Sequence, residues 1–383
     1  MHLYRKLYPY LISVLLCTAW FMAACDANIP TIQNPVRVEE QPVPIEQAEL
    51  TAEVLKDTEK KGAETTQIEI VISHSQRQSS PEHAAAQAMQ QALQEQLGDR
   101  VDVILYADCQ LGTAREQLEA VQLGRLHIAI QSAAELSAFV DDVKVLTMPY
   151  LFSDNRDEVI DGLQSAWGQE LLERVNQDRH GFEGLGLWFG GYKLLAYDGA
   201  AQKEIHSPAD FCDLKIAVAD APILKAQYHQ WHAEAVVVEE NLLFRALEQN
   251  WVDGCEMTVQ RMADNRSYEL LHNVVQAYHS AEIYAVLTNQ AWFTALPADV
   301  QIAIREAEVC GRQVMQEELD ERESFYLRII CQAEGMNYYV LNPSEIEIFR
   351  ASVQPIYTEQ LAGNQWQKTF VERLQILYNC NEQ

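Results

Sequence analysis

Two histidines and two glutamates have the types and spacing that could support metal or acid–base chemistry. His229 and His232 lie at helical spacing, but the sequence nearby offers no third ligand for a metal ion. Glu248 and Glu256 could act as a general acid and base, yet nothing in the sequence brings them together. The sequence also contains no Gly-x-Ser-x-Gly elbow, no phosphate-binding loop and no dinucleotide fingerprint. We therefore expect neither an enzyme nor a metal or cofactor site.

Other polar residues stand at the ends of short apolar runs. Gln131 and Ser132 directly follow the run Leu126–Ile130, and His74 follows the run Ile68–Ile72. In open α/β sheets, ligands bind beyond the carboxyl ends of the strands. Gln131, Ser132 and His74 are therefore candidate ligand-binding residues, although a hydrogen-bonded loop would explain each of them equally well.

The stretch Ser207–Pro222 contains a further candidate strand. Ser207 is placed to cap a short helical turn, and Leu214–Val218 is a short apolar run with the pattern of a buried strand. Near the exit of this strand stands Ala217, which is small and apolar. Earlier in the chain, Tyr192 could stack on an apolar ligand, or it could pack in the core.

Alternating apolar patterns predict a first α/β domain. Strands are expected at Ile68–Ile72, Val101–Ala107 and Leu126–Ile130, with one helix beginning near Pro81 and a second ending at Gly124. This βαβαβ alternation is typical of a parallel sheet with helices on its faces.

The pattern then changes towards a second domain. A helix is expected at Val159–Arg174 and a strand at Leu185–Trp188, and the glycines of Phe189–Lys193 are predicted to break that strand where the chain first crosses over. Ala298–Ala333 is the longest helical pattern. Its roughly 36 residues would span about 54 Å, so we expect this helix to run across both domains.

Composition narrows the classes of partner. The chain has 383 residues, 48% of them apolar, and a formal net charge of −28. This length is enough for about two domains. Nucleic acid and anionic membrane surfaces are polyanions, so the acidity argues against both as partners.

The first residues are expected to be a targeting segment. Arg5 and Lys6 precede the apolar run Leu11–Ala24, which is too short to span a bilayer comfortably. The run ends in Met-Ala-Ala followed by Cys25, which resembles a bacterial lipobox. Residues 1–25 are thus predicted to be a lipoprotein signal, with Cys25 lipidated and residues 26–66 acting as a flexible tether. An ordinary signal peptide or an uncleaved anchor are the alternatives.

Six cysteines follow Cys25, and their wide spacings include no Cys-x-x-Cys pair. An exported compartment permits disulfides, but six cysteines allow 15 pairings and the sequence does not choose among them. Buried free thiols are the expected state.

The order of several short motifs resembles the extracytoplasmic substrate-binding proteins of TRAP transporters, the DctP-type family. The resemblance covers about Ile68–Phe370. The matching motifs are Gln110-Leu111-Gly112, Pro149-Tyr150-Leu151-Phe152, Ser207-Pro208, Asp213-Leu214-Lys215-Ile216, Ala246-Leu247-Glu248, Val252-Asp253-Gly254 and Leu296-Pro297.

The resemblance implies a two-domain periplasmic binding protein of type II-like architecture, with a ligand cleft at the hinge and the long helix bracing both domains. The first domain would comprise residues 67–190 and 283–322, and the second residues 191–282 and 323–383. It also implies capture of a small organic solute by hinge closure and delivery to a TRAP membrane permease. The protein would be periplasmic and lipid-anchored, with Asp26 resembling an inner-membrane retention signal.

This sequence departs from the family pattern at the expected ligand contacts. The family usually has an arginine where Ala217 stands, a second arginine at Lys193, and an asparagine at Met257. The departures argue against a standard C4-dicarboxylate or sialic-acid-like ligand. Three interpretations remain open: a monocarboxylate held by Lys193 with its apolar body near Ala217 and Met257, a neutral or cationic solute facing Glu256 or Glu239, and a lipid-tethered sensing or interaction protein that has lost carboxylate binding.

Overall fold

The computed structural model describes residues 67–198 and 204–379, all within one compact unit of the chain. Its strands are β1 (Ile68–His74), β2 (Val101–Tyr106), β3 (Ile128–Ser132), β4 (Phe182–Tyr197), β5 (Lys215–Val218), β6 (Glu234–Val237), β7 (Gly254–Thr258), β8 (Asn273–Gln276), β9 (Ala281–Asn289) and β10 (Asn337–Val340). Its α-helices are α2 (Pro81–Leu97), α3 (Ala114–Gln122), α4 (Ala133–Leu136), α5 (Arg156–Gln164), α6 (Ala166–Gln177), α7 (Pro222–Gln230), α8 (Leu243–Glu248), α9 (Val259–Asp264), α10 (Gln290–Ala295), α11 (Ala298–Gln332), α12 (Pro343–Ser352), α13 (Gln354–Gln360) and α14 (Gln365–Asn379).

The predicted signal, the lipidation of Cys25 and the tether at 26–66 lie outside the described residues and stay predictions. Within the described residues, no helix is long and apolar enough to cross a membrane.

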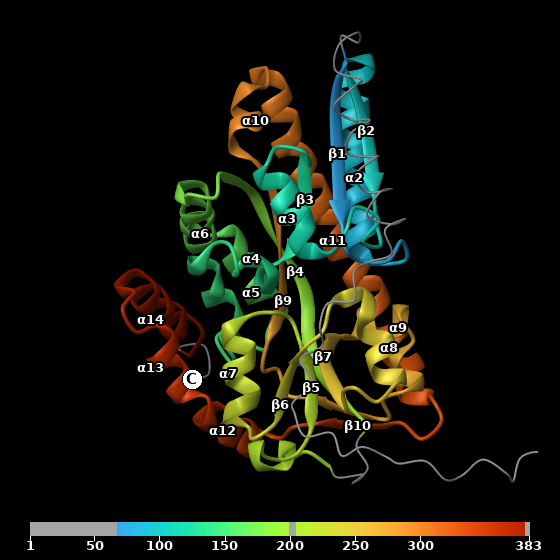
Figure 1. Cartoon of the computed structure of the whole chain (residues 1–383), viewed down its shortest axis with the longest axis vertical. Helices are drawn as coiled ribbons and strands as arrows, with labels where there is room; N and C mark the ends of the chain where they lie inside the picture. The colour runs from blue at the N-terminus through green and yellow to red at the C-terminus, as the bar shows by residue number, and fades with distance from the viewer. Residues whose placement is uncertain (1–66, 199–203, 380–383) are drawn as a thin grey trace, which may run out of the picture. The chain divides into compact units, whose positions relative to one another are not determined.

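One mixed sheet organises these elements. Its strand order is β2-β1-β3-β9-β4-β7-β5-β6, and β8 pairs with β4 and with β10 beside this path. β1 is parallel to β2 and β3, as the βαβαβ pattern predicted. β9 is antiparallel to β3 and to β4, so the sheet as a whole is not parallel. We call the half with β1–β3 the first lobe and the half with β5–β8 and β10 the second lobe (Figure 1).

The long strand β4 belongs to both lobes. Its residues up to Tyr192 pair with β9, whereas Lys193–Tyr197 pair with β7. The register shifts between Phe189 and Tyr192, and Gly191 lies there with a φ of 107°, which L side chains rarely adopt. The predicted break at the glycines is therefore wrong. They form an irregularity inside a strand of 16 residues, and the chain changes its pairing partner just beyond it. The domain boundaries proposed from the sequence stay a prediction.

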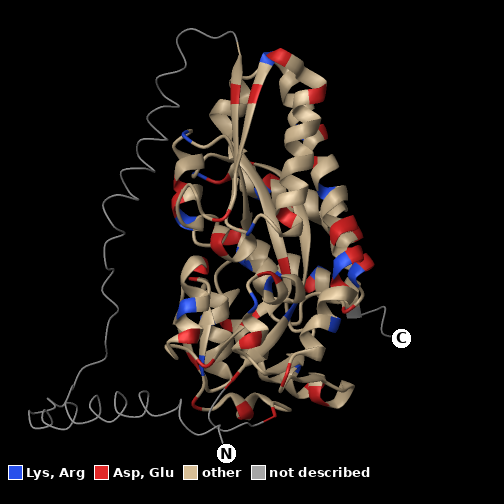
Figure 2. Ribbon diagram, turned by 90° about the vertical axis from the view of Figure 1, so that its right-hand side faces the viewer, with Lys and Arg blue, Asp and Glu red and all other residues tan. Residues whose placement is uncertain are grey.

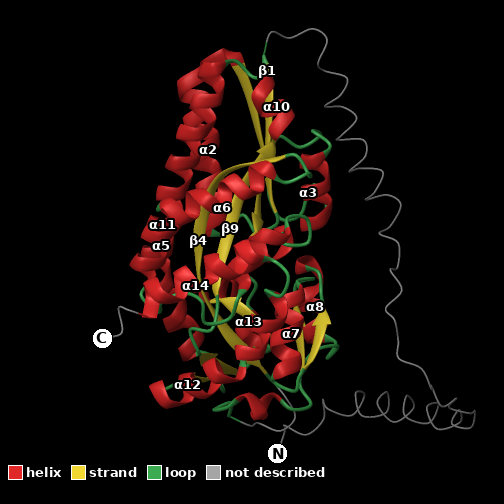
Figure 3. Ribbon diagram, turned by 90° about the vertical axis from the view of Figure 1, so that its left-hand side faces the viewer, coloured by secondary structure: helices red, strands yellow, loops and turns green. Residues whose placement is uncertain are grey.

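The long helix α11 joins the two lobes, as predicted. It is 35 residues long and packs against α2 and β4 as well as α9 of the second lobe. α2 and α11 approach closely at Gly311, where a Cβ atom would lie 2.6 Å from Met89 Cγ. Figure 3 shows the two helices side by side along one edge of the molecule.

Another helix prediction needs correction. The pattern Val159–Arg174 is not one helix, because α5 ends at Gln164 and α6 begins at Ala166. Ser165 between them has an extended backbone, and its hydroxyl donates to the carbonyl oxygen of Gly162 at 2.7 Å.

The C-terminal helices also reach the first lobe. In α14, Trp366 Nε1 donates to Glu170 Oε1 at 2.8 Å, and Gln367 Nε2 donates to the carbonyl oxygen of Asp141 at 3.1 Å. Glu170 lies on α6, and Asp141 begins a 3-10 turn that follows α4. The segment after α11 therefore makes contacts that the sequence-based assignment to the second domain did not anticipate.

Charge and cysteine positions complete the description. Acidic positions are spread over both lobes (Figure 2). The five described cysteines are all free: Cys255 is buried, Cys109 and Cys310 are half-buried, and Cys212 and Cys331 are exposed. The prediction of free thiols is thus confirmed for these five, and that of burial only for Cys255.

Candidate functional site

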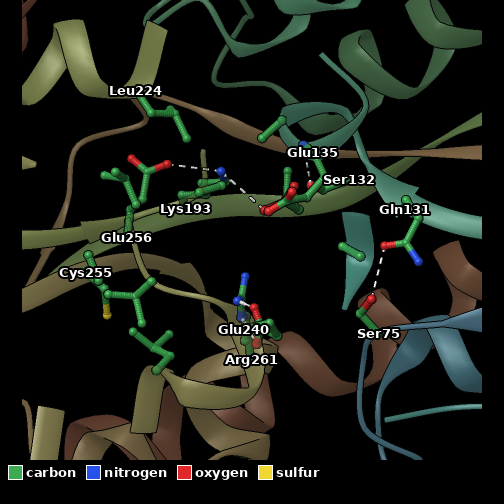
Figure 4. A pocket seen from close by; sticks show the side chains of 18 of the residues that line it. Ser75, Gln131, Ser132, Glu135, Lys193, Leu224, Glu240, Cys255, Glu256 and Arg261 are labelled. Atoms are coloured by element: carbon green, nitrogen blue, oxygen red, sulfur yellow. Dashed lines mark hydrogen bonds and ion pairs between the residues drawn. The ribbon is translucent and has the colours of Figure 1, made fainter. Parts of the chain in front are cut away.

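A small cavity of about 70 Å³ lies where the two lobes meet. From the first lobe and β9 it is lined by Ser75, Gln76, Ala114, Gln131, Ser132, Ala134, Glu135, Glu282 and Tyr284. From β4 and the second lobe it is lined by Lys193, Ala217, Val218, Ala219, Leu224, Val238, Glu240, Leu243, Cys255, Glu256 and Arg261. Figure 4 shows these side chains converging from several elements.

The first-lobe wall is positioned by the end of β3. Gln131 accepts a hydrogen bond from Ser75 Oγ at 3.1 Å through Oε1, and its Nε2 donates to Gln117 Oε1 at 2.8 Å. Ser132 caps α4, because its hydroxyl accepts from the backbone N–H of Glu135 at 3.2 Å. This cap fixes the start of the short helix that brings Glu135 to the cavity.

Lys193 stands at the centre of the site, one residue after the irregularity in β4. Its Nζ lies 3.0 Å from Glu256 Oε1 (Figure 4). The same Nζ lies 3.3 Å from Glu282 Oε2. The Lys193, Glu256 and Glu282 side chains are only 8%, 4% and 7% exposed. We call these three residues the Lys193 cluster.

Glu256 is the best-satisfied member of the Lys193 cluster. Besides Lys193, its carboxylate accepts a hydrogen bond from Tyr228 Oη at 3.0 Å and contacts His279 Nε2 at 3.1 Å. Burial alone would raise the pKa of Glu256, but Lys193 and His279 hold it well below its usual range. Burial would likewise lower the pKa of Lys193, and the Glu256 and Glu282 carboxylates raise it above its ordinary value. Lys193 and Glu256 are therefore both ionised at neutral pH.

Acidic groups outnumber basic groups around the cavity. The lining has four carboxyl groups, on Glu135, Glu240, Glu256 and Glu282, and two cationic groups, on Lys193 and Arg261. Burial, together with the nearby charges of Glu239, Asp220 and Glu282, raises the pKa of Glu135 to about 7. The site can thus hold a polar solute, and it is not a simple anion-binding pocket.

Five of the residues predicted from the sequence meet at this cavity. They are Lys193, Ala217, Gln131, Ser132 and Glu256. Ala217 is 4% exposed and contributes only a methyl group, so the cavity has no cationic side chain at that position.

Three predicted residues lie elsewhere. His74 is fully buried with Nε2 3.0 Å from His83 Nδ1, and burial followed by the effect of His83 lowers its pKa to about 3. Tyr192 packs edge-on against Phe189, and its hydroxyl donates to the carbonyl oxygen of Ser153 at 2.7 Å. Met257 is fully buried in the core of the second lobe. Side chains of a strand alternate between its two faces, so Glu256 at the cavity places Met257 on the opposite side of β7.

The metal and acid–base candidates are not brought together. His229 and His232 are both exposed, and the described residues contain no group of three or more His, Cys, Asp or Glu side chains that could hold a metal ion. Glu248 is exposed at the end of α8 whereas Glu256 is buried. Burial raises the pKa of the Cys255 thiol above its ordinary value, so this cavity-lining thiol is not an activated nucleophile.

Sequence reasoning missed Glu282 and Arg261. Glu282 is the charged residue of the buried strand Ala281–Asn289, and a charge in a buried strand is a signal for a paired or functional group. Arg261 lies on α9, which directly follows β7, and no pattern in the sequence marks it.

Comparisons with known proteins identify the family of this chain. Residues 72–364 match the family of bacterial extracellular solute-binding proteins, family 7, known as DctP. The C4-dicarboxylate-binding periplasmic protein DctP of Rhodobacter capsulatus is 25% identical over 293 residues, covering 76% of this chain and 86% of that protein. The sialic acid-binding periplasmic protein SiaP of Vibrio cholerae is 24% identical over 284 residues, covering 73% of this chain and 84% of that protein.

Solved structures share the fold. A TRAP periplasmic solute-binding protein from Shewanella oneidensis with bound succinate superposes with a TM-score of 0.76 at 23% identity, covering 82% of this chain and 99% of that one. A second from Anaerococcus prevotii with bound D-glucuronate gives a TM-score of 0.75 at 23% identity, with the same coverages. These relatives are solute-binding proteins of transport systems and not enzymes. The family match at residues 72–364 spans more than half of the chain. The chain therefore belongs to the DctP family of extracellular solute-binding proteins, as the order of its motifs predicted.

Proposed function

We propose that this chain is the solute receptor of a TRAP transporter, which captures a small organic solute between its lobes and delivers it to a membrane permease. The observation that carries the proposal is the polar cavity at the meeting point of the lobes, lined from both sides and centred on Lys193. Related proteins with this fold hold succinate, orotate or D-glucuronate.

The favoured solute is an organic acid whose carboxylate contacts Lys193 and whose body lies near Ala217. Glu282 is the carboxylate that such a solute would displace, because it is the more distant of the two partners, at 3.3 Å against 3.0 Å. Glu256 would stay in place, since Tyr228 and His279 also hold it. The solute carboxylate would thus take the place of Glu282 beside Lys193, and the Lys193–Glu256 ion pair would stay intact.

A cationic solute is the second candidate, and the excess of carboxyl groups around the cavity favours it. Burial and the repulsion of nearby carboxylates keep the pKa of Glu135 raised, and an ammonium group near Glu135 and Glu282 would offset both effects. The relatives do not favour the remaining alternative, a tethered interaction protein without a solute.

A thermal-shift screen with succinate, D-glucuronate, orotate, putrescine and choline tests the proposal. A ligand that binds only the native state adds about 2.7 kcal/mol of stability at 100 times its dissociation constant. Stabilisation by an acid that is lost in Lys193→Met supports the first candidate, and stabilisation by an amine supports the second. An acid that binds Lys193→Met as tightly as the wild type would refute the role of Lys193, provided that the variant is folded by circular dichroism.

Hinge closure is the proposed mechanism of capture. Two-lobed receptors that close on a solute become more compact, so the radius of gyration from small-angle X-ray scattering should fall when a tight ligand is added. Superimposable profiles with and without that ligand would contradict closure.

A further inference from the structure

A second cavity adjoins the first, and an arginine–glutamate pair stands in the wall between them. The second cavity has a volume of about 150 Å³. Ser75, Gln76, Glu240 and Arg261 line both cavities. Any solute that extends from one cavity into the other must therefore pass the Arg261–Glu240 pair.

The pair has two-point geometry. Arg261 Nε donates to Glu240 Oε1 at 2.7 Å, and Arg261 Nη2 pairs with Glu240 Oε2. Arg261 lies on α9, and Glu240 begins the 3-10 turn Glu240–Leu242, so both belong to the second lobe. A planar guanidinium gripping both oxygens of a carboxylate is also the arrangement by which arginine binds a carboxylate ligand. Glu240 thus occupies the position that a solute carboxylate would take.

Replacing the protein carboxylate by a solute carboxylate is easier at Arg261 than at Lys193. The Arg261 and Glu240 side chains are 21% and 26% exposed, whereas those of Lys193 and Glu282 are 8% and 7% exposed. A displaced Glu240 can turn into water and keep its hydration. A displaced Glu282 would have less access to water and would be closer to an unpaired buried charge, which is unfavourable.

An unsatisfied donor lies next to Arg261. Gln260 is 4% exposed and lines the second cavity, and its Nε2 has no hydrogen-bond partner among the described residues. Buried donors without an acceptor are rare in native proteins. An oxygen atom of a solute in the second cavity would supply the missing acceptor.

We infer that Arg261 is a carboxylate-binding residue of this receptor and that Glu240 is an internal competitor, which holds the guanidinium until a solute carboxylate replaces it. Arg261 in this way supplies the planar cationic group that Ala217 lacks. The inference rests on the proposed receptor function and adds a specificity-determining pair to it.

Calorimetric titration of succinate, D-glucuronate and orotate into wild type, Glu240→Gln, Arg261→Gln and the double variant tests the inference. Removing the competitor should tighten binding of the best acid about tenfold, and removing the guanidinium should weaken it about tenfold or more, as expected for one charge-assisted contact. The gain from Glu240→Gln should vanish in the Arg261→Gln background. Arg261→Lys should recover only part of the affinity, because lysine lacks the fork.

Glu239→Gln is the matched control, because it removes the same charge from the neighbouring residue. Equal gains from Glu239→Gln and Glu240→Gln would show a general charge effect and overturn the inference. So would an unchanged affinity in Arg261→Gln, or no binding of any acid to either wild type or Glu240→Gln. In that last case, a thermal shift with putrescine or choline would still uphold the receptor function, so the two failures are distinguishable.

Discussion

Replacing Lys193 by methionine should strongly destabilise the protein. The substitution keeps the length of the side chain and removes the ammonium that lies between Glu256 and Glu282. Both carboxylates are at most 7% exposed, so they would remain as buried charges without their cation. Breaking a buried ion pair by removing one partner costs about 3–5 kcal/mol, and we expect a loss of that size in the free energy of unfolding.

The stability lost in Lys193→Met should be partly recovered when the charge of Glu256 is removed as well. In Lys193→Met/Glu256→Gln only one cluster carboxylate, Glu282, remains charged and buried, so this variant should be more stable than Lys193→Met alone. Arg115→Met is the surface control. It breaks a pair with Glu119 whose side chains are 60% and 48% exposed, and it should cost less than about 1 kcal/mol.

Urea unfolding at pH 7 and at pH 4 measures these effects. The folded-state pKa of Glu256 lies below its unfolded value. The stability that the ion pair contributes is therefore fully present above the unfolded pKa, and it is lost as pH falls from there towards the folded-state pKa. The difference between wild type and Lys193→Met should therefore shrink as pH falls below about 4.5. A Lys193→Met variant that loses less than about 1 kcal/mol at pH 7 would refute the claim that Lys193 neutralises this cluster.

Two further predictions test other parts of the structure. The folded-state pKa of Glu135 is raised from 4.5 to about 7, so the stability of the wild type should fall as pH rises through that window. In calorimetric unfolding, Glu135→Gln should therefore be more stable than the wild type by about 2–3 kcal/mol at pH 8. The two proteins should not differ in stability below about pH 4.5. Gly191→Val places a branched side chain at a φ of 107° and should lower the free energy of unfolding by about 1–3 kcal/mol. The control is Gly98→Val, which also has a positive φ but has open space around it, so it separates backbone strain from contacts near Gly191. A Gly191→Val protein as stable as wild type would contradict the need for glycine where β4 crosses between the lobes.

Local patterns in the sequence were enough to predict most of the fold. Helix α2 begins at Pro81, Ser207 caps the turn before β5, and the long helix α11 begins at Ala298, all as the sequence patterns indicated. The glycines at 190 and 191 were misread because a glycine pair has the same signature whether it ends a strand or bends one. The antiparallel role of β9 depends on pairing with β3 and β4, which no local pattern specifies.

The site could be predicted only in part. Gln131 and Ser132 were identified because the end of a strand marks a position at the edge of the sheet. The face on which a side chain lies depends on register, so Met257 entered the core while its neighbour Glu256 reached the cavity. Arg261 and Glu282 escaped prediction because their importance arises from partners distant in sequence: Arg261 pairs with Glu240 and Glu282 with Lys193.

Native mass spectrometry of the protein, purified from its own cells without refolding, tests the central claim most directly. A receptor that closes on a solute should carry a single small molecule at one-to-one stoichiometry, and the mass of that molecule would identify an acid or an amine. The absence of any adduct, together with no thermal stabilisation by carboxylates, amines or neutral solutes, would contradict a solute-receptor function for this cavity.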